Sequence, residues 1–319
     1  MAHLLEKMAY VGDVPWHGLG NQLRANQPIE VWAQQAGMDW RIRESPVSFM
    51  TSDAGSVGAI ASFPENKVLF CSDTKMPLSV VSQRFQVVQP SEILEFYRDL
   101  TEVSGFELET AGVLKGGRKI WALARTGQSS TLKGNDVNNA YVLLATACDG
   151  TLATTAQFTS IRVVCNNTLA VALSASNGAV KVRHSTSFDA QAVKRQLGIS
   201  VSTWNSFMYQ MKGLSERKVK THEAMNYLSR VLSGEKKDSI GTASDRTMAK
   251  VMTLFDGHGR GAELASSKGT AFGLLNSVTE FVDHQRRARS TDHRLESAWF
   301  GQGAGLKEKA LEQALMMIA

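Results

Sequence analysis

The sequence predicts an α+β protein in which a largely antiparallel sheet, with helices inserted, precedes a basic helical C-terminal region. Two turns carry this prediction, because Gly116-Gly117 and Asp149-Gly150 each separate a pair of apolar, alternating runs, which is the pattern of a β-hairpin. Strands joined mainly by hairpins form an antiparallel sheet rather than a doubly wound one. Beyond about residue 188, apolar residues recur with the spacing of amphipathic helices.

The elements of the first region follow from local patterns. Short or alternating apolar runs predict strands outside the hairpins at residues 40–50, 66–73, 79–90 and 179–187. The first of these breaks near Pro46, and the third ends at Pro90. A helix is expected after Pro90, with Ser91 as its N-cap. We therefore expect residues 1–187 to form an α+β sheet domain.

The second region, residues 188–319, is expected to be helical and to pack on the sheet. Helices are predicted at residues 188–214, 216–232, 244–257, 270–289 and 306–318. A glycine-rich linker at residues 257–269 precedes the fourth helix, and a loop that ends at Gly305 precedes the fifth.

Composition defines the broad class of protein. The chain has 319 residues, of which 43% are hydrophobic and 20% charged, as in soluble globular proteins. No apolar run reaches the roughly 18 residues of a membrane span, and the first residues lack the apolar core of a signal peptide. Cys71, Cys148 and Cys165 are widely spaced, which indicates buried thiols rather than disulfides or a metal site. We expect a cytoplasmic protein with no cofactor and no metal.

Charge is distributed unevenly along the chain. Residues 1–179 carry 14 lysines and arginines against 16 aspartates and glutamates, whereas residues 180–319 carry 21 against 14. A basic half suggests a polyanionic partner. The alternative is an ordinary solvated helical surface.

The segment FTSIRVVCNNTLAVAL, residues 158–173, predicts a strand, a cap and a buried helix, with Arg162 at the junction. Free amides at a helix start and a guanidinium can together hold an anion. The alternative is a plain corner in which Arg162 pairs with a carboxylate.

Other candidate residues also have structural alternatives. Lys307 follows three glycines at a predicted helix start, which suits a phosphate or an ordinary linker. Trp299 could stack on a base or dock the last helix, and Trp16 could stack or close a core edge. The arginine cluster of residues 286–294 suits phosphate contact, whereas its histidines lack the spacing of a metal site. No catalytic signature appears, and we expect no enzyme.

Five blocks of sequence resemble the phage/plasmid-like protein family, also catalogued as domain of unknown function 932. They are PWHGLG (residues 15–20), LETAGVLKGGRKIWALA (108–124), FTSIRVVCNNTLAVAL (158–173), GTAFGLLNSVTEFVDHQRR (269–287) and AWFGQGAGLKEKAL (298–311). The resemblance implies a cytoplasmic protein of phages, prophages and plasmids, and it assigns no catalytic residue.

Three functional hypotheses follow. The first is a homo-oligomeric protein that binds nucleic acid, with single-stranded DNA annealing in recombination or replication as the analogy. The residues expected to bind are Arg162, Lys181, Arg183, Arg286, Arg287, Arg289 and Lys307 for phosphates, and Trp16, Trp121 or Trp299 for bases. The second is a non-catalytic module that binds a host protein. The third is an enzyme that binds a phosphorylated ligand at Arg162, Asn166 and Asn167.

Overall fold

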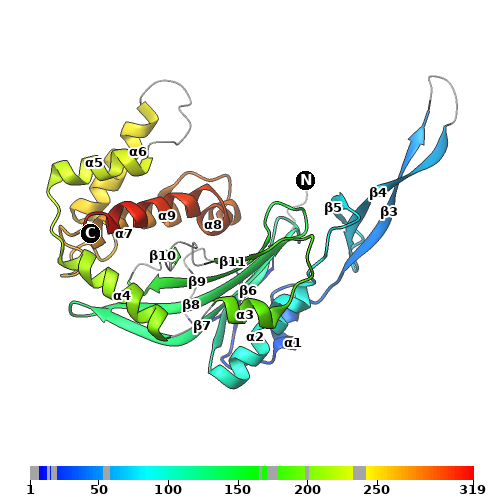
Figure 1. The fold of residues 1–319 in the computed structure, drawn as a ribbon, viewed down its shortest axis with the longest axis horizontal. Coiled ribbons are helices and arrows are strands. Elements are labelled where there is room, and N and C mark those ends of the chain that lie inside the picture. The colour runs from blue at the N-terminus through cyan, green and yellow to red at the C-terminus, as the bar shows by residue number, and fades with distance from the viewer. Residues whose placement is uncertain are drawn as a thin grey trace.

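A computed structural model describes residues 7–12, 15, 20–52, 58–164, 167–170, 179–197, 201–232 and 242–319. The chain forms an α+β fold, as the sequence predicts, around one curved sheet with the strand order β10-β9-β8-β7-β6-β1-β2. A second sheet has the order β3-β4-β5 and extends away from the body (Figure 1). Within the described ranges, all strand pairs are antiparallel except β1 with β2.

Two hairpins build the centre of the large sheet. Its long strands are β6 (Glu107–Leu114), β7 (Lys119–Leu132), β8 (Asp136–Ala147) and β9 (Thr154–Arg162). Gly117 and Gly150 adopt φ angles of +90° and +75° in the β6–β7 and β8–β9 turns, which L side chains rarely adopt. Both predicted hairpins are therefore confirmed.

The segment after Arg162 folds differently from the prediction. Residues 167–170 form the strand β10 (Asn167–Ala170), which pairs with residues 159–162 of β9. A second short strand, β11 (Ala179–Val182), pairs with the first half of β9. A short apolar run fits a strand as well as a helix, so the available edge of β9 decides between them.

Helices cover the sheet on its two faces. On one side lie α1 (Ile29–Gln35) and α2 (Pro90–Ser104) (Figure 1). Helix α2 contacts β6 and β7, and α1 contacts β1 (Met8–Val11), which with β2 (Asn21–Leu23) lies at one end of the sheet. Helix α2 has Gln89 and not the predicted Ser91 as its N-cap, and Glu92 accepts a hydrogen bond from the backbone N–H of Gln89. The buried Tyr97 hydroxyl lies 2.7 Å from the carbonyl oxygen of Ala122 in β7, which fixes α2 on the sheet.

The remaining helices form the C-terminal region. They are α3 (Ala190–Leu197), α4 (Val201–Glu216), α5 (Thr221–Leu232), α6 (Thr242–Thr253), α7 (Ala271–Glu280), α8 (Thr291–Phe300) and α9 (Gln302–Leu315). The π-helical turns η1 (Leu254–His258) and η2 (Phe281–Gln285) extend α6 and α7. None of the helices described is long and apolar enough to cross a bilayer.

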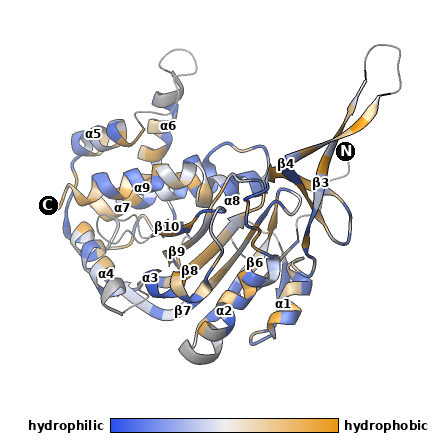
Figure 2. Ribbon diagram, turned by 45° about the vertical axis from the view of Figure 1, so that its right-hand side comes forward, coloured by the Kyte–Doolittle hydropathy of each residue, from blue (hydrophilic) through white to orange (hydrophobic). Residues whose placement is uncertain are grey.

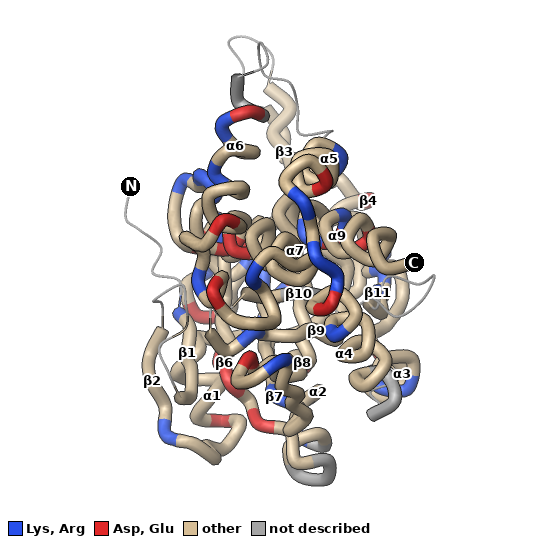
Figure 3. The backbone as a smooth tube through the Cα atoms, turned by 90° about the vertical axis from the view of Figure 1, so that its left-hand side faces the viewer, with Lys and Arg blue, Asp and Glu red and all other residues tan. Residues whose placement is uncertain are grey.

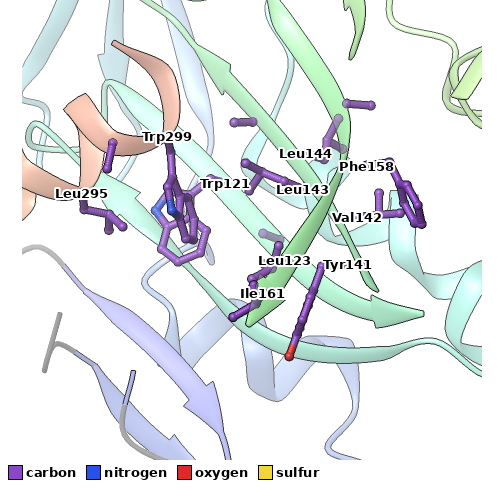
Figure 4. Close-up of a cluster of buried hydrophobic side chains, with 14 of the residues drawn as sticks. Trp121, Leu123, Tyr141, Val142, Leu143, Leu144, Phe158, Ile161, Leu295 and Trp299 are labelled. Carbon is purple, nitrogen blue, oxygen red and sulfur yellow. The ribbon is translucent and has the colours of Figure 1, made fainter. Parts of the chain in front are cut away.

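Helix α8 forms where the sequence predicted a loop. Its N-cap Ser290 accepts a hydrogen bond from the backbone N–H of His293. Leu295 and Trp299 then reach the sheet, where the Trp299 ring meets Trp121 of β7 edge to face, with 4.8 Å between ring centres (Figure 4). Burial against the sheet therefore stabilises a helix whose local sequence is mostly polar.

The second sheet forms a projecting arm. Its strands are β3 (Ile42–Thr51), β4 (Ala59–Cys71) and β5 (Pro77–Ser82), and the outer parts of β3 and β4 reach far from the body (Figure 1). The register of β3 against β4 shifts between Pro46 and Val47, because proline cannot donate to the ladder. The break predicted near Pro46 is confirmed as this irregularity.

Candidate nucleic-acid interface

Arg162, the first candidate cation, lies inside the protein. It is 3% exposed, and its Nε and Nη2 donate to the two carboxylate oxygens of Asp136 at 2.8 and 2.7 Å. Nη2 also donates to the Ser267 hydroxyl, and the guanidinium lies over the Phe272 ring. A buried guanidinium that already pairs with a carboxylate is not placed to neutralise a phosphate. The expected contact of Arg162 with an anion is therefore corrected. The alternative expectation, in which Arg162 pairs with a carboxylate, describes the site.

Lys307 is likewise an internal cation. It is 5% exposed, and its Nζ donates to Asp283 Oδ1 at 2.8 Å and to the Thr168 hydroxyl at 2.6 Å. Burial lowers its pKa, and the charge of Asp283 opposes that shift. The expected phosphate contact of Lys307 is therefore also corrected. The hydrogen bonds of the two cations to hydroxyl groups, Arg162 to Ser267 and Lys307 to Thr168, join the sheet to the C-terminal region.

Trp121 and Trp299, the two candidate tryptophans among the described residues, do not form an exposed stacking platform. Trp299 is 9% exposed and Trp121 is fully buried, and the two rings pack together. Trp299 therefore packs the C-terminal helices onto the sheet, as the alternative to base stacking predicted. Trp16 lies outside the described residues, as do Cys165 and Asn166. The other two cysteines, Cys71 and Cys148, are buried, and burial raises the pKa of both thiols, that of Cys148 to about 12.

The remaining predicted cations are more accessible. Lys181 and Arg183 are exposed at β11, and Arg287 and Arg289 are exposed after η2. Arg286 is half-buried and donates to the Ser297 hydroxyl and to Gln302 Oε1, both at 3.2 Å. Four of the predicted cations thus face solvent, on two separate segments of the chain.

A cavity of about 240 Å³ lies between β9 and β11 on one side and α8 and α9 on the other. Leu143, Ile161 and Trp299 supply apolar walls, and Lys181 supplies a cation at its lining. The anion site expected at Arg162 and Asn167 is not part of this space, because Arg162 pairs with Asp136 and the Asn167 amide donates to Asn276. Among the described residues, no group of three His, Cys, Asp or Glu side chains is placed to hold a metal.

A basic cluster that the sequence reasoning missed forms around the connection from α4 to α5. Contacts between distant segments assemble it. The backbone N–H of Val219 donates to Gly269 and that of Ala271 to Arg217, while Lys218 Nζ donates to the Lys268 carbonyl at 3.0 Å. We call the resulting cluster the basic patch; it consists of Lys133, Lys212, Arg217, Lys218, Lys220 and Lys268.

Lys133 joins the basic patch from the turn between β7 and β8, because its Nζ donates to the Ser215 carbonyl at 2.7 Å. Figure 3 faces this side of the molecule and shows basic residues along the connection between α4 and α5, with an acidic residue near each end of it. Three separate segments of the chain therefore place their cations on one surface.

Two carboxylates adjoin the basic patch, at Glu216 and Glu223. Glu223 accepts from the Arg217 guanidinium at 2.5 Å and from the backbone N–H of Lys220 at 2.9 Å. These hydrogen bonds, that of Arg217 above all, lower the pKa of Glu223 to about 2. Glu223 is thus ionised at neutral pH and orders Arg217, while the lysines of the patch remain in excess.

An exposed aromatic ring borders the basic patch. Tyr209 of α4 is 79% exposed, and it precedes Lys212 by three residues, which places the two side chains on the same helical face. Phe207 and Met211 bury the opposite face of α4. The ring of Tyr209 is therefore held at the surface beside the cations, and an exposed ring beside cations can stack on a base.

The sequence held a signal for this surface. Residues 217–220 read Arg-Lys-Val-Lys, and the apolar spacing predicts that they belong to a helix that begins at residue 216. The structure instead places Lys218 in an isolated β-bridge with Thr270, and α5 begins only at Thr221. Because that bridge depends on a segment about 50 residues away, the local pattern could not reveal it.

Comparison with known proteins gives a family. The family model described as domain of unknown function (DUF932) matches residues 77–299, which include β5 to β9 and most of the C-terminal helices. Comparisons with curated proteins and with solved structures found no match. The match covers more than half of the chain, and the chain therefore belongs to the DUF932 family.

Proposed function

We propose that this protein binds nucleic acid through the basic patch, and that Tyr209 stacks on an unpaired base. The observation that carries the proposal is the convergence of six cations from three segments beside a tyrosine that is 79% exposed. Cations follow a phosphate backbone whatever its sequence. An exposed ring adds stacking that only an unpaired base offers, so single-stranded nucleic acid is the preferred form.

The mechanism would be non-catalytic. Lys212, Lys220 and Lys268 are exposed, so each can release a counterion from the bound strand, which makes affinity fall steeply with salt. We include in this proposal a role in annealing or recombination on a phage or plasmid, which accords with the family that the sequence resembles.

The test is binding of labelled single-stranded and double-stranded DNA over a salt series. The variant Lys212→Ala/Lys220→Ala/Lys268→Ala removes three exposed cations of the patch. We expect it to bind single strands at least about tenfold more weakly, with a log–log salt slope smaller by roughly 2, or about 0.7 for each contact. Tyr209→Ala should weaken single-strand binding and leave the salt slope unchanged, because stacking releases no counterion.

A control of equal charge separates this patch from a general attraction. Lys181→Ala/Arg287→Ala/Arg289→Ala also removes three exposed cations, at the places where the sequence predicted contacts. It should bind like the unmodified protein. An equal loss in both variants would show that no single face binds. Absence of single-strand binding at low salt, or undiminished binding by the patch variant, would overturn the proposal.

A further inference from the structure

The cavity between the sheet and the last two helices takes no part in the proposed binding of nucleic acid. Its floor is the face of the sheet beside which α8 and α9 lie (Figure 2). Leu123, Leu143 and Gln157 are paired in one row across β7, β8 and β9, and paired residues share a face. All three line the cavity, as does Trp299 from the end of α8. The sheet and the two helices therefore bound the space from opposite sides.

The volume of the cavity suits a small organic molecule. It measures about 240 Å³, and an apolar cavity of about 150 Å³ is large enough to hold benzene. At the same ratio, a ligand of about ten non-hydrogen atoms fits, which is a ring with a short chain. Leu143, Ile161 and Leu311 line the cavity, and apolar walls of this kind bind the body of such a ligand.

Two polar side chains of the lining lie close together on the floor. Ala179 pairs with Gln157, and Lys181 pairs with Thr155, so Gln157 and Lys181 are diagonal neighbours about 7–8 Å apart. Among the described residues, neither side chain has a hydrogen-bond partner, and both line the cavity. An ammonium group and an amide N–H at this spacing can donate to the two oxygens of one carboxylate.

The far end of the cavity does not attract an anion. There the ammonium of Lys307 is already balanced by Asp283, to which it donates at 2.8 Å. Glu308 follows on α9 and adds a carboxylate to the lining. Lys307 also bonds to Thr168, which pairs with residue 161 of β9, whereas Lys181 pairs with residue 155. The two ends are thus roughly 20 Å apart along β9, and a negative group is favoured only at the end that holds Lys181.

We propose that this cavity binds a small monocarboxylic acid with an apolar body, of the arylalkyl type. The carboxylate accepts hydrogen bonds from Lys181 and Gln157, and the body packs between Leu143 and Trp299. The single accessible cation matches the single negative charge of this ligand. The inference goes beyond the proposed binding of nucleic acid, because none of the lining residues belongs to the basic patch.

Isothermal titration calorimetry of the full chain with phenylpropionate tests the proposal, and phenylpropanol is the uncharged probe of similar size. For a ligand of about eleven non-hydrogen atoms, we expect a dissociation constant on the order of 100 µM. Phenylpropanol should bind about tenfold more weakly, because it lacks the charge-assisted hydrogen bonds.

Two substitutions on the floor test the carboxylate contacts. Lys181→Gln and Gln157→Leu should each weaken phenylpropionate binding by about fivefold to tenfold and should leave phenylpropanol binding unchanged. The matched control is Arg183→Gln. Arg183 is exposed, lies two residues after Lys181 and does not line the cavity, so this variant should bind both probes like the unmodified protein.

A third substitution fills the space. Ala304 is half-buried and lines the cavity from α9, so Ala304→Phe should abolish the binding of both probes. Glu312→Phe is the control on the same helix, because Glu312 is exposed and lies outside the lining. Circular dichroism of each variant shows whether it is folded, and the exposed position of Lys181 makes Lys181→Gln independent of that question.

Three results would overturn the proposal. One is no binding of phenylpropionate up to about 5 mM, fifty times the expected dissociation constant. Another is undiminished binding by a folded Ala304→Phe variant. The third is an equal loss in Lys181→Gln and Arg183→Gln, which would reveal a general attraction to basic surface. The variant Lys212→Ala/Lys220→Ala/Lys268→Ala should bind phenylpropionate normally, so failure of this proposal is distinguishable from failure of the DNA-binding one.

Discussion

Arg162 and Asp136 share two hydrogen bonds in the interior, so each makes the burial of the other tolerable. Arg162→Met should lower the free energy of unfolding by about 3–5 kcal/mol, because it leaves the Asp136 carboxylate buried without its counter-ion. Adding Asp136→Leu should recover part of that loss. Urea denaturation measures both effects.

The control for this prediction is a pair near the surface. Arg125 and Glu109 form an ion pair in which the arginine side chain is 44% exposed, and exposed pairs contribute little, about 0–1 kcal/mol. Arg125→Met should therefore cost much less than Arg162→Met. Similar losses at the two sites would contradict the internal role of Arg162.

Glu280 gives a pH-dependent stability. It is buried, its Oε2 accepts from the backbone N–H of Arg260, and burial raises its pKa above 4.5. The folded protein then holds a proton that the unfolded chain has already lost, so stability falls as pH rises from 4.5 through the folded pKa. Glu280→Gln should be more stable than the unmodified protein at pH 7, by about 1.4 kcal/mol for each unit of pKa shift.

The advantage of Glu280→Gln should shrink as pH falls toward 4, as followed by urea denaturation at several pH values. Glu223 provides a control of opposite sign. Its pKa is lowered to about 2, so its contribution is present above pH 4.5 and is lost as pH falls toward 2. Glu223→Gln should therefore be less stable than the unmodified protein at pH 7. An effect of the same sign at both positions would contradict these assignments.

At the scale of single residues, the sequence showed which cations to consider but not where they face. Arg162 stood out because it interrupts an apolar run. Its partner Asp136 lies 26 residues earlier, across the β8–β9 hairpin, and Ser267 lies 105 residues later. No local sequence pattern identifies these partners. The sequence around Arg162 is therefore equally compatible with a buried ion pair and with an open anion site.

At the scale of elements, the β6–β7 turn shows why some parts of the fold were predictable. Gly117 has φ +90°, and a Cβ there would lie 2.9 Å from the Trp40 ring. Gly117→Ala should therefore destabilise the protein by more than the ~1–2 kcal/mol of left-handed strain alone. Gly134 has φ +89° with open space around it, so Gly134→Ala should show only the strain.

Thermal unfolding of the two variants measures the difference in stability, and equal losses would mean that contact with Trp40 contributes nothing.

The range over which an element is determined explains which elements the sequence predicts. Glycine turns act locally, so both hairpins were found. Strand β10 was missed because a short apolar run does not distinguish a strand from a helix, and its pairing with β9 decides. Helix α8 was missed because it depends on Trp121, far earlier in the chain.

At the scale of the whole molecule, the two predicted regions share one interior. Trp299 packs on Trp121, and Lys307 bonds to Thr168, so the helical region completes the core of the sheet. Composition and periodicity correctly gave a sheet followed by helices. They could not show that the basic surplus gathers beside Tyr209, because that surface combines residues 133, 212–220 and 268.

The bond from Lys307 to Thr168 also has a consequence for the newborn chain. The two residues are 139 positions apart, and at about 5–20 residues per second a ribosome needs roughly 7–28 s to make that interval. Throughout it, Trp121, Leu123 and Leu143 on the sheet await the helix that will cover them (Figure 4). The nascent sheet therefore exposes this apolar surface to water until the last helices have been made.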